Sequence, residues 1–155
     1  MSATKRFVEE FGLISQEGGD SRISGRIMGL LVVAGHELSL SQISERLGVS
    51  RASVSTNARQ LARRGAIRLT AHAGDRQDYY QLSNLSYVDV IGEIAGRFKR
   101  HARTIQSCVV EMRDEDAKAA ERAAGMQEFF EKSAEILDDW ANSLRTGGTM
   151  RKDAK

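Results

Sequence analysis

The segment from Ser41 to Leu82 constrains the fold of this chain more than any other part of it. Its letters are SQISERLGVSRASVSTNARQLARRGAIRLTAHAGDRQDYYQL. Two short helical patterns are separated by a Gly-Val step, and two strand-like runs follow around a polar turn. A helix, a tight turn, a second helix and a hairpin at these separations are typical of a winged helix-turn-helix. We therefore expect a mainly α protein with a small β-hairpin wing.

Local signals place the ends of these elements. Ser41 and Ser50 are the expected N-caps of the two helices. Gly48 supplies the positive φ that the turn requires, and Gly65 ends the second helix. Residues 38–40 suffice only for a strand stub ahead of the first helix. The hairpin then has its tip at residues 73–75 and returns over residues 79–82.

Two further helices are expected before this segment. The first covers Ala3–Gln16 and has its apolar residues four and three apart, as in an amphipathic helix. The second ends near Gly35 and contains Gly25 and Gly29. Each of these internal glycines costs about 1 kcal/mol of helix propensity, so they predict close packing against another backbone.

A long helical arm is expected after Asn84. Apolar residues from Tyr87 to Met112 recur at nearly heptad spacing with one stutter at Ala102, and a second seam follows after a break near 114–116. A head of about 60 residues cannot bury two such seams, so a second copy of the chain is the expected partner. The residues expected at the dimer interface are Phe7, Phe11, Ile91, Ile94, Phe98, Ile105, Val109, Phe130, Leu137, Trp140 and Leu144.

Four regions follow from this pattern. They are an N-terminal helix (1–20) that joins the dimer interface, a winged helix-turn-helix (21–83), a helical dimerisation region (84–146) and a flexible tail (147–155).

Charge is distributed unevenly along the chain. Residues 42–80 hold seven arginines and three acids, a net charge of +4, whereas residues 111–139 hold ten acids and four bases, a net charge of −6. A basic head on an acidic arm suits phosphate binding, although two ordinary solvated faces would look the same.

Several functional classes are not supported by the composition. Cys108 is the single cysteine, the three histidines have no ligand spacing, and no metal or other cofactor is expected. Cys108 lies in an apolar periodic stretch, so we interpret it as a small buried hydrophobe rather than a redox sensor. No nucleophile elbow or phosphate loop is present, so no enzyme is predicted. An apolar run near 18 residues is also missing, and we expect a cytoplasmic protein without membrane contact.

The outer face of the second helix is the candidate DNA-reading surface. At 100° per residue, Val54, Ala58 and Leu61 face inward, while Thr56, Arg59 and Arg63 point away from them. Thr56 and Arg59 are expected to contact bases. Phosphate contacts are expected from the helix starts and from the basic side chains, namely Ser41, Arg51 and Arg63, with Ser53 and Ser55 beside them. An ordinary solvated helix is the alternative.

The hairpin tip adds a second basic element. Arg76 lies between two acids in Asp75-Arg76-Gln77-Asp78, where it is suited to a narrow minor groove. The flanking carboxylates are expected to hold its guanidinium by charge-assisted hydrogen bonds. A soluble turn rich in Asp and Gly is the alternative interpretation.

Residues 25–82 resemble the winged-helix head of the MarR superfamily, and within it the GbsR-like branch. The resemblance rests on four motifs in register, GRIMGLL, LGVS, VSTN and GDRQDYY, and covers about 58 of the 155 residues. Ala58 departs from the pattern, since the family usually has a larger aliphatic residue there. By position, the resemblance implies DNA contacts at Ser50, Arg51, Ser53, Ser55, Thr56, Asn57, Asp75 and Arg76.

The resemblance also implies a dimeric transcriptional regulator, often a repressor. Some members respond to a small-molecule effector, and choline is one such ligand in this branch. An aromatic box for a quaternary ammonium needs several inward rings, and aromatic residues make up only 6% of this chain. The leading hypothesis is a homodimer on double-stranded DNA, and the alternative is a winged-helix protein-interaction module without operator binding.

Overall fold

A computed structural model describes residues 1–84 and 86–147 of the chain. It divides into two compact units, Met1–Asn84 and Leu85–Lys155, each of which is described by itself. The expected tail at 147–155 lies outside the described residues, apart from Gly147.

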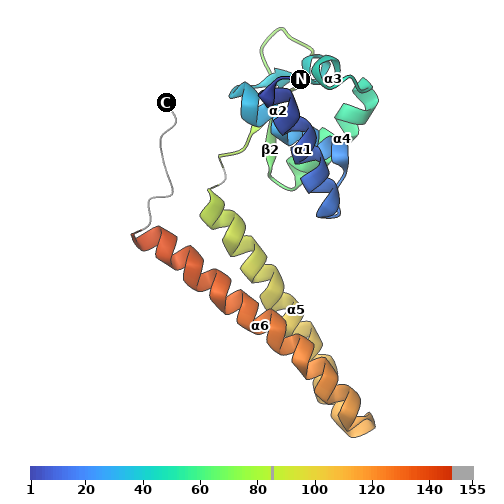
Figure 1. Ribbon diagram of the computed structural model, residues 1–155, viewed down its shortest axis with the longest axis vertical. Coiled ribbons are helices and arrows are strands. Elements are labelled where there is room, and N and C mark those ends of the chain that lie inside the picture. Colours follow the sequence, from blue (N-terminus) through green and yellow to red (C-terminus); the bar gives the residue numbers. More distant parts are fainter. Residues whose placement is uncertain (85, 148–155) are drawn as a thin grey trace. The chain divides into compact units, whose positions relative to one another are not determined.

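The first unit contains four helices and a small sheet (Figure 1). The helices are α1 (Ala3–Glu17), α2 (Arg22–Ala34), α3 (Leu40–Leu47) and α4 (Arg51–Arg63). The strands are β1 (Leu38–Ser39), β2 (Ile67–Thr70) and β3 (Tyr79–Leu82), in the order β1-β3-β2 with both pairings antiparallel. The mainly α fold with a β-hairpin wing is therefore confirmed.

A single apolar core joins the helices of this unit to its sheet. Its fully buried large side chains come from α2, α3, α4 and all three strands, and include Ile27, Leu31, Leu38, Ile43, Val54, Ile67 and Tyr80. The α4 stripe Val54, Ala58 and Leu61 is buried, as its spacing predicted. This core fixes the inner face of α4 and so determines which of its side chains face solvent.

The glycines of α2 allow α1 to pack at backbone distance. A Cβ atom added at Gly25 would lie 2.4 Å from the Ser15 Cβ and 2.6 Å from the Phe11 carbonyl oxygen. At Gly29 the same atom would lie 3.2 Å from the Cα of Val8. The close approach predicted from these two glycines is confirmed, and the N-terminal helix is thereby part of the first unit.

The start of α3 differs from the prediction. Ser39, not Ser41, is the N-cap: its Oγ accepts from the Gln42 N–H at 3.2 Å, and the Gln42 side-chain oxygen accepts from the Ser39 N–H at 2.8 Å. This reciprocal capping box needs a Gln or Glu three residues after the cap. Ser44 occupies that place for Ser41, so the helix begins earlier.

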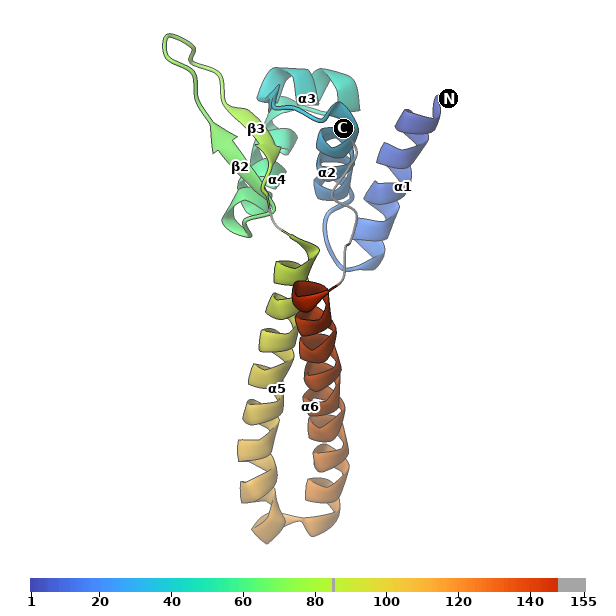
Figure 2. The same cartoon turned by 90° about the vertical axis from the view of Figure 1, so that its left-hand side faces the viewer.

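The second unit is a hairpin of two long helices, α5 (Tyr87–Glu115) and α6 (Ala117–Thr146), which run antiparallel side by side (Figures 1 and 2). The break falls where it was predicted, because the side chain of Asp116 caps α6 at the Ala119 N–H. Ile91 and Val109 of α5 are buried within this hairpin, as are Ala134 and Ala141 of α6.

Two expectations for α5 must be corrected. Ile91 and Val109 were assigned to a dimer interface, but the antiparallel partner helix of the same chain already buries them. Cys108 is exposed, so its interpretation as a buried hydrophobe was wrong. It is adjacent to Val109 in sequence, and one helical step of 100° is enough to turn it out of the seam.

Candidate nucleic-acid interface

Helix α4 is held at its N-terminus by a cap and along one side by the core. The Ser50 Oγ accepts from the Ser53 N–H at 3.2 Å, as the sequence predicted. Gly48 precedes it with φ of 63°, which confirms the left-handed turn between α3 and α4. The remaining backbone N–H groups of the first turn of α4 are therefore presented at an exposed helix end, which is a favourable place for an anion.

The solvent face of α4 carries the predicted basic side chains. Arg51, Thr56, Arg59 and Arg63 are exposed, while Ser53 and Ser55 are half-buried. The Arg59 Nη2 donates to the Ser55 Oγ at 2.6 Å and its Nε to the same oxygen at 3.2 Å. Ser55 thus holds the guanidinium along the helix and acts on Arg59 rather than projecting outward itself.

Asn57 does not lie on this face. It is buried, and its Oδ1 accepts from the hydroxyl of Ser24 on α2 at 3.0 Å. Its amide group donates to the Ser53 carbonyl at 2.8 Å. Because both ends of the amide are engaged inside the unit, Asn57 packs α4 on α2, and the DNA contact that the resemblance implies stays a prediction.

Ser41 lies one residue inside α3 and is half-buried. The other end of α3 is tied to α2, because the Arg26 Nη2 donates to the Leu47 carbonyl at 2.8 Å. Arg26 also pairs with Glu9 of α1 at 2.7 Å. This connection fixes α3, and hence the turn into α4, against the first two helices.

Ion pairs separate the arginines of this unit into two groups. Arg22 and Arg26 pair with Glu9, and Arg64 pairs with Asp20. Among residues 1–84, a second group of arginines is exposed and has no carboxylate partner: Arg6 on α1, and Arg46, Arg51, Arg59, Arg63, Arg68 and Arg76. Apart from Lys5 and Arg6 on α1, the unpaired positive side chains of this unit are therefore on α3, α4 and the hairpin.

The loop between β2 and β3 extends past the helices of its unit (Figure 2). Arg76 is exposed near its end, but the flanking acids do not hold its guanidinium, contrary to the prediction. Asp75 instead accepts from the Tyr79 hydroxyl at 2.6 Å and from the Gln77 N–H at 2.9 Å. The Tyr79 bond and then the Gln77 bond hold the Asp75 pKa below its ordinary value, and the same carboxylate raises the Tyr79 pKa.

Sequence reasoning missed the support of this wing. Glu37, just before β1, accepts from the Thr70 hydroxyl at 2.7 Å and from the His72 Nε2. These bonds, first that of Thr70, lower the Glu37 pKa. The partners are more than 30 residues apart, and the register Leu38↔Tyr80 and Thr70↔Tyr79 that brings them together is not visible in any local pattern.

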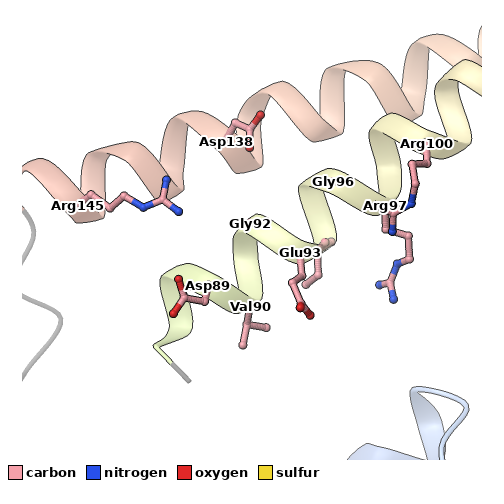
Figure 3. Close-up of a pocket in the computed structure, with 10 residues that line it drawn as sticks. Asp89, Val90, Gly92, Glu93, Gly96, Arg97, Arg100, Asp138 and Arg145 are labelled. Carbon is pink, nitrogen blue, oxygen red and sulfur yellow. The ribbon is translucent and has the colours of Figure 1, made fainter. Parts of the chain in front are cut away.

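A groove of about 850 Å³ lies on the α5–α6 hairpin beside Gly92 and Gly96 of α5 (Figure 3). Its lining mixes acids and arginines and comprises Asp89, Val90, Gly92, Glu93, Ile94, Gly96, Arg97, Arg100, Asp138 and Arg145. No aromatic ring is among these residues, so this groove does not have the chemistry of a quaternary-ammonium box.

Metal-ligand clusters and membrane spans are both absent from the part of the chain that the structure describes. There, no group of three or more His, Cys, Asp or Glu side chains is placed to hold a metal ion. Nor does any helix of residues 1–84 and 86–147 combine the length and apolarity needed to cross a bilayer.

Part of this chain is similar to known transcription regulators. Residues 21–78 match the model of the MarR family, whose members are transcription regulators rather than enzymes. The chain is 38% identical over 77 residues to the HTH-type transcriptional regulator MmpR5 of Mycobacterium tuberculosis (strain ATCC 25618 / H37Rv). That alignment covers 49% of this chain and 47% of MmpR5, so the match spans about half of the relative's length.

A solved structure shares the fold. A crystal structure of a transcriptional regulator aligns with 94% of this chain and 100% of its own, at a TM-score of 0.77 and 22% sequence identity. At this identity the likeness concerns the fold alone.

Proposed function

On the premise that residues 21–78 form a winged helix of the MarR family, we propose that this chain is a homodimeric, sequence-specific DNA-binding transcription regulator. One observation carries the proposal. Apart from Arg6 on α1, the exposed arginines of the first unit without acidic partners are those of α3, α4 and the wing. The arginines on α2 and just after α4 are instead neutralised by acids from α1 and the loop after it. Uncompensated charge on a helix and a hairpin suits a polyanion that has two grooves.

The proposed contacts follow the geometry of the two elements. Helix α4 enters the major groove, where Thr56 and Arg59 contact bases, and Ser55 fixes the guanidinium of Arg59. Phosphates are bound by the helix starts and the flanking arginines, namely Ser41, Ser50, Arg51, Ser53 and Arg63. Arg76 enters the adjacent minor groove.

The homodimer rests on an apolar stripe that the hairpin leaves uncovered. Met126, Phe129, Ile136 and Trp140 of α6 are between 48% and 68% exposed and follow steps of 3, 7 and 4. On α1, Phe7 and Ile14 are likewise 40% and 60% exposed. Exposed large apolar side chains in one helical line mark an interaction surface. The same surface on a second copy is the simplest complement, and a dimer suits a DNA site with two half-sites about 34 Å apart.

Repression by occupancy of a pseudo-palindromic operator is the mode of action we propose, and the four motifs favour the GbsR-like branch. An effector is also part of this proposal. The groove of Figure 3, with three arginines and three acids, suits a polar or zwitterionic molecule better than choline.

Selection of bound genomic fragments by the purified chain, followed by fluorescence anisotropy at several salt concentrations, tests DNA recognition. We expect selected duplexes to bind at least about 1,000-fold more tightly than random duplex, with an affinity that falls steeply with salt. Arg59→Ala should relax base preference, and Arg76→Ala should weaken binding, while Arg113→Ala removes the same charge from α5 as a matched control. Equal affinity for random and selected duplex, or no salt dependence, would reject the proposal in favour of a protein-interaction module.

Sedimentation tests the dimer. Ile136→Asp places a charge in the middle of the stripe and should convert the dimer to a monomer at micromolar concentration. Asn142→Asp is the matched control: it adds the same charge to exposed α6 surface about 240° around the helix from Ile136. A parent chain that sediments as a monomer, or a dimer that both substitutions leave intact, would contradict this assignment.

A further inference from the structure

The wing is a long loop whose side chains have little core to pack on. Residues 71–78 are all exposed, yet this loop carries Arg76. A loop of that kind would lose considerable conformational freedom on binding DNA unless something in the free protein already ordered it.

One carboxylate ties the root of the wing to the head. Glu37 lies between α2 and β1, and each of its oxygens accepts one bond from the hairpin: Oε2 from the Thr70 hydroxyl at 2.7 Å, and Oε1 from the His72 Nε2. The Glu37 side chain is 30% exposed, so water competes for it only in part. Thr70 ends β2 and His72 lies two residues further on, so these bonds hold the point where the strand becomes a loop.

A second set of contacts continues from His72 to the tip. The His72 ring packs edge-on against Tyr79, with centroids 4.6 Å apart and planes at 81°. The Tyr79 hydroxyl donates to Asp75, and Asp75 accepts from the Gln77 N–H. The Asp75 N–H donates to the His72 carbonyl at 3.1 Å, which closes the turn. Arg76 lies between the two residues joined by the Asp75–Gln77 bond.

We propose that Glu37 and His72 are positioning residues for DNA recognition, which fix the wing so that Arg76 is presented before the duplex arrives. The inference rests on the proposed function for its DNA part. Glu37 is an anion at the root of the wing, so with the wing in a DNA groove its charge alone would weaken DNA binding. If Glu37 positions the wing, its removal weakens DNA binding. If Glu37 acts only through its charge, its removal strengthens DNA binding, so the sign of the change distinguishes the two roles.

The test begins with the free, full-length protein. Glu37→Ala should increase the picosecond-to-nanosecond motion of the backbone amides at residues 75–77, measured by heteronuclear NOE, and leave α4 as rigid as before. Glu37→Gln keeps the shape and one acceptor oxygen and should give a smaller change. Glu45→Ala, which removes a carboxylate from α3, is the matched control for charge. Wing amides that stay equally ordered in Glu37→Ala would overturn the proposal, whether or not the parent chain binds DNA.

DNA affinity then tests the link to Arg76. Glu37→Ala should weaken binding about tenfold in the parent, because the ordering of the wing must now occur on binding. In an Arg76→Ala background the same substitution should have no effect, since the wing has lost the group that it positions. Tighter binding by Glu37→Ala, or an equal loss in both backgrounds, would overturn the positioning role. A parent chain that binds no DNA rejects the proposed function instead, and the amide measurement still decides whether Glu37 orders the wing.

Discussion

Replacement of Asn57 by Ala tests whether this residue packs α4 or contacts DNA. Ser24, 1% exposed, donates its hydroxyl to the Asn57 amide oxygen, so the substitution leaves a buried donor without an acceptor. A stranded buried hydroxyl costs about 1–3 kcal/mol. The space vacated by the amide adds about 1 kcal/mol, so we expect a total loss of about 2–4 kcal/mol.

Hydrogen exchange of the α4 amides is the appropriate assay, because global unfolding would mix the two units. Measurements at one protein concentration remove the effect of assembly on stability. Gln60→Ala removes an exposed amide from the same helix and should change the opening free energy by less than about 0.5 kcal/mol.

A double-mutant cycle supplies the decisive outcome. Ser24→Ala alone should cost about 1–2 kcal/mol, and the double variant should cost about 1 kcal/mol less than the sum of the two single variants. If Asn57→Ala leaves α4 as stable as the parent and abolishes DNA binding, the packing argument is refuted, and the contact implied by family resemblance is restored.

Three further outcomes follow from the structure. Gly25→Ala should destabilise the first unit by at least about 2 kcal/mol in urea unfolding, because its Cβ would lie 2.4 Å from a side-chain carbon of α1. Gly125→Ala is the contrasting variant: its Cβ would meet nothing within 4 Å, so it should stabilise α6 by about 0.4–1 kcal/mol. Hydrogen bonds from Thr70 and from Tyr79 hold the pKa values of Glu37 and Asp75, respectively, below those of free carboxyl groups. Both carboxylates therefore stabilise the wing above the ordinary carboxyl pKa, and this stabilisation is lost as the pH falls through the lower folded pKa values. Limited proteolysis within residues 71–78 should therefore accelerate on acidification, and unchanged cleavage would contradict this. Cys108 is exposed and should react with a thiol reagent in the native protein; protection until unfolding would show that a partner covers it.

Local chemistry explains which parts of the fold were predictable. The left-handed Gly48, the Ser50 cap and the inward stripe of α4 each depend on residues within one or two turns, and the sequence contains that information. The predicted start of α3 was wrong because both Ser39 and Ser41 could act as its N-cap. Only the reciprocal hydrogen bonds between Ser39 and Gln42 decide between them.

Side-chain partners distant in sequence were not predictable in the same way. Asn57 lies beside outward-facing residues on α4, and only the packing of α2 gives it a buried partner 33 positions earlier. The support of the wing by Glu37 depends on strand register for the same reason. From sequence alone, a polar residue on a basic helix is readily assigned to DNA binding. Whether it has that role depends on whether its side chain is exposed or buried.

Heptad periodicity alone could not predict whether an apolar stripe of α5 or α6 packs against the other helix of the same chain or against a second copy. An antiparallel hairpin buries one stripe of each helix, and α6 uses Ala134 and Ala141 for that purpose. The stripe centred on Ile136 stays exposed because α6 is apolar on more than one face, whereas a two-helix hairpin needs only one apolar face on each helix.

If the exposed stripe pairs two copies of the chain, the first head to bind DNA holds the second head near its half-site at a high effective concentration. The monomeric Ile136→Asp variant should then bind a full operator and an isolated half-site with similar affinity. If it instead retained the parent's preference for the full operator, pairing through α6 would contribute nothing to recognition, and the exposed stripe would need another partner.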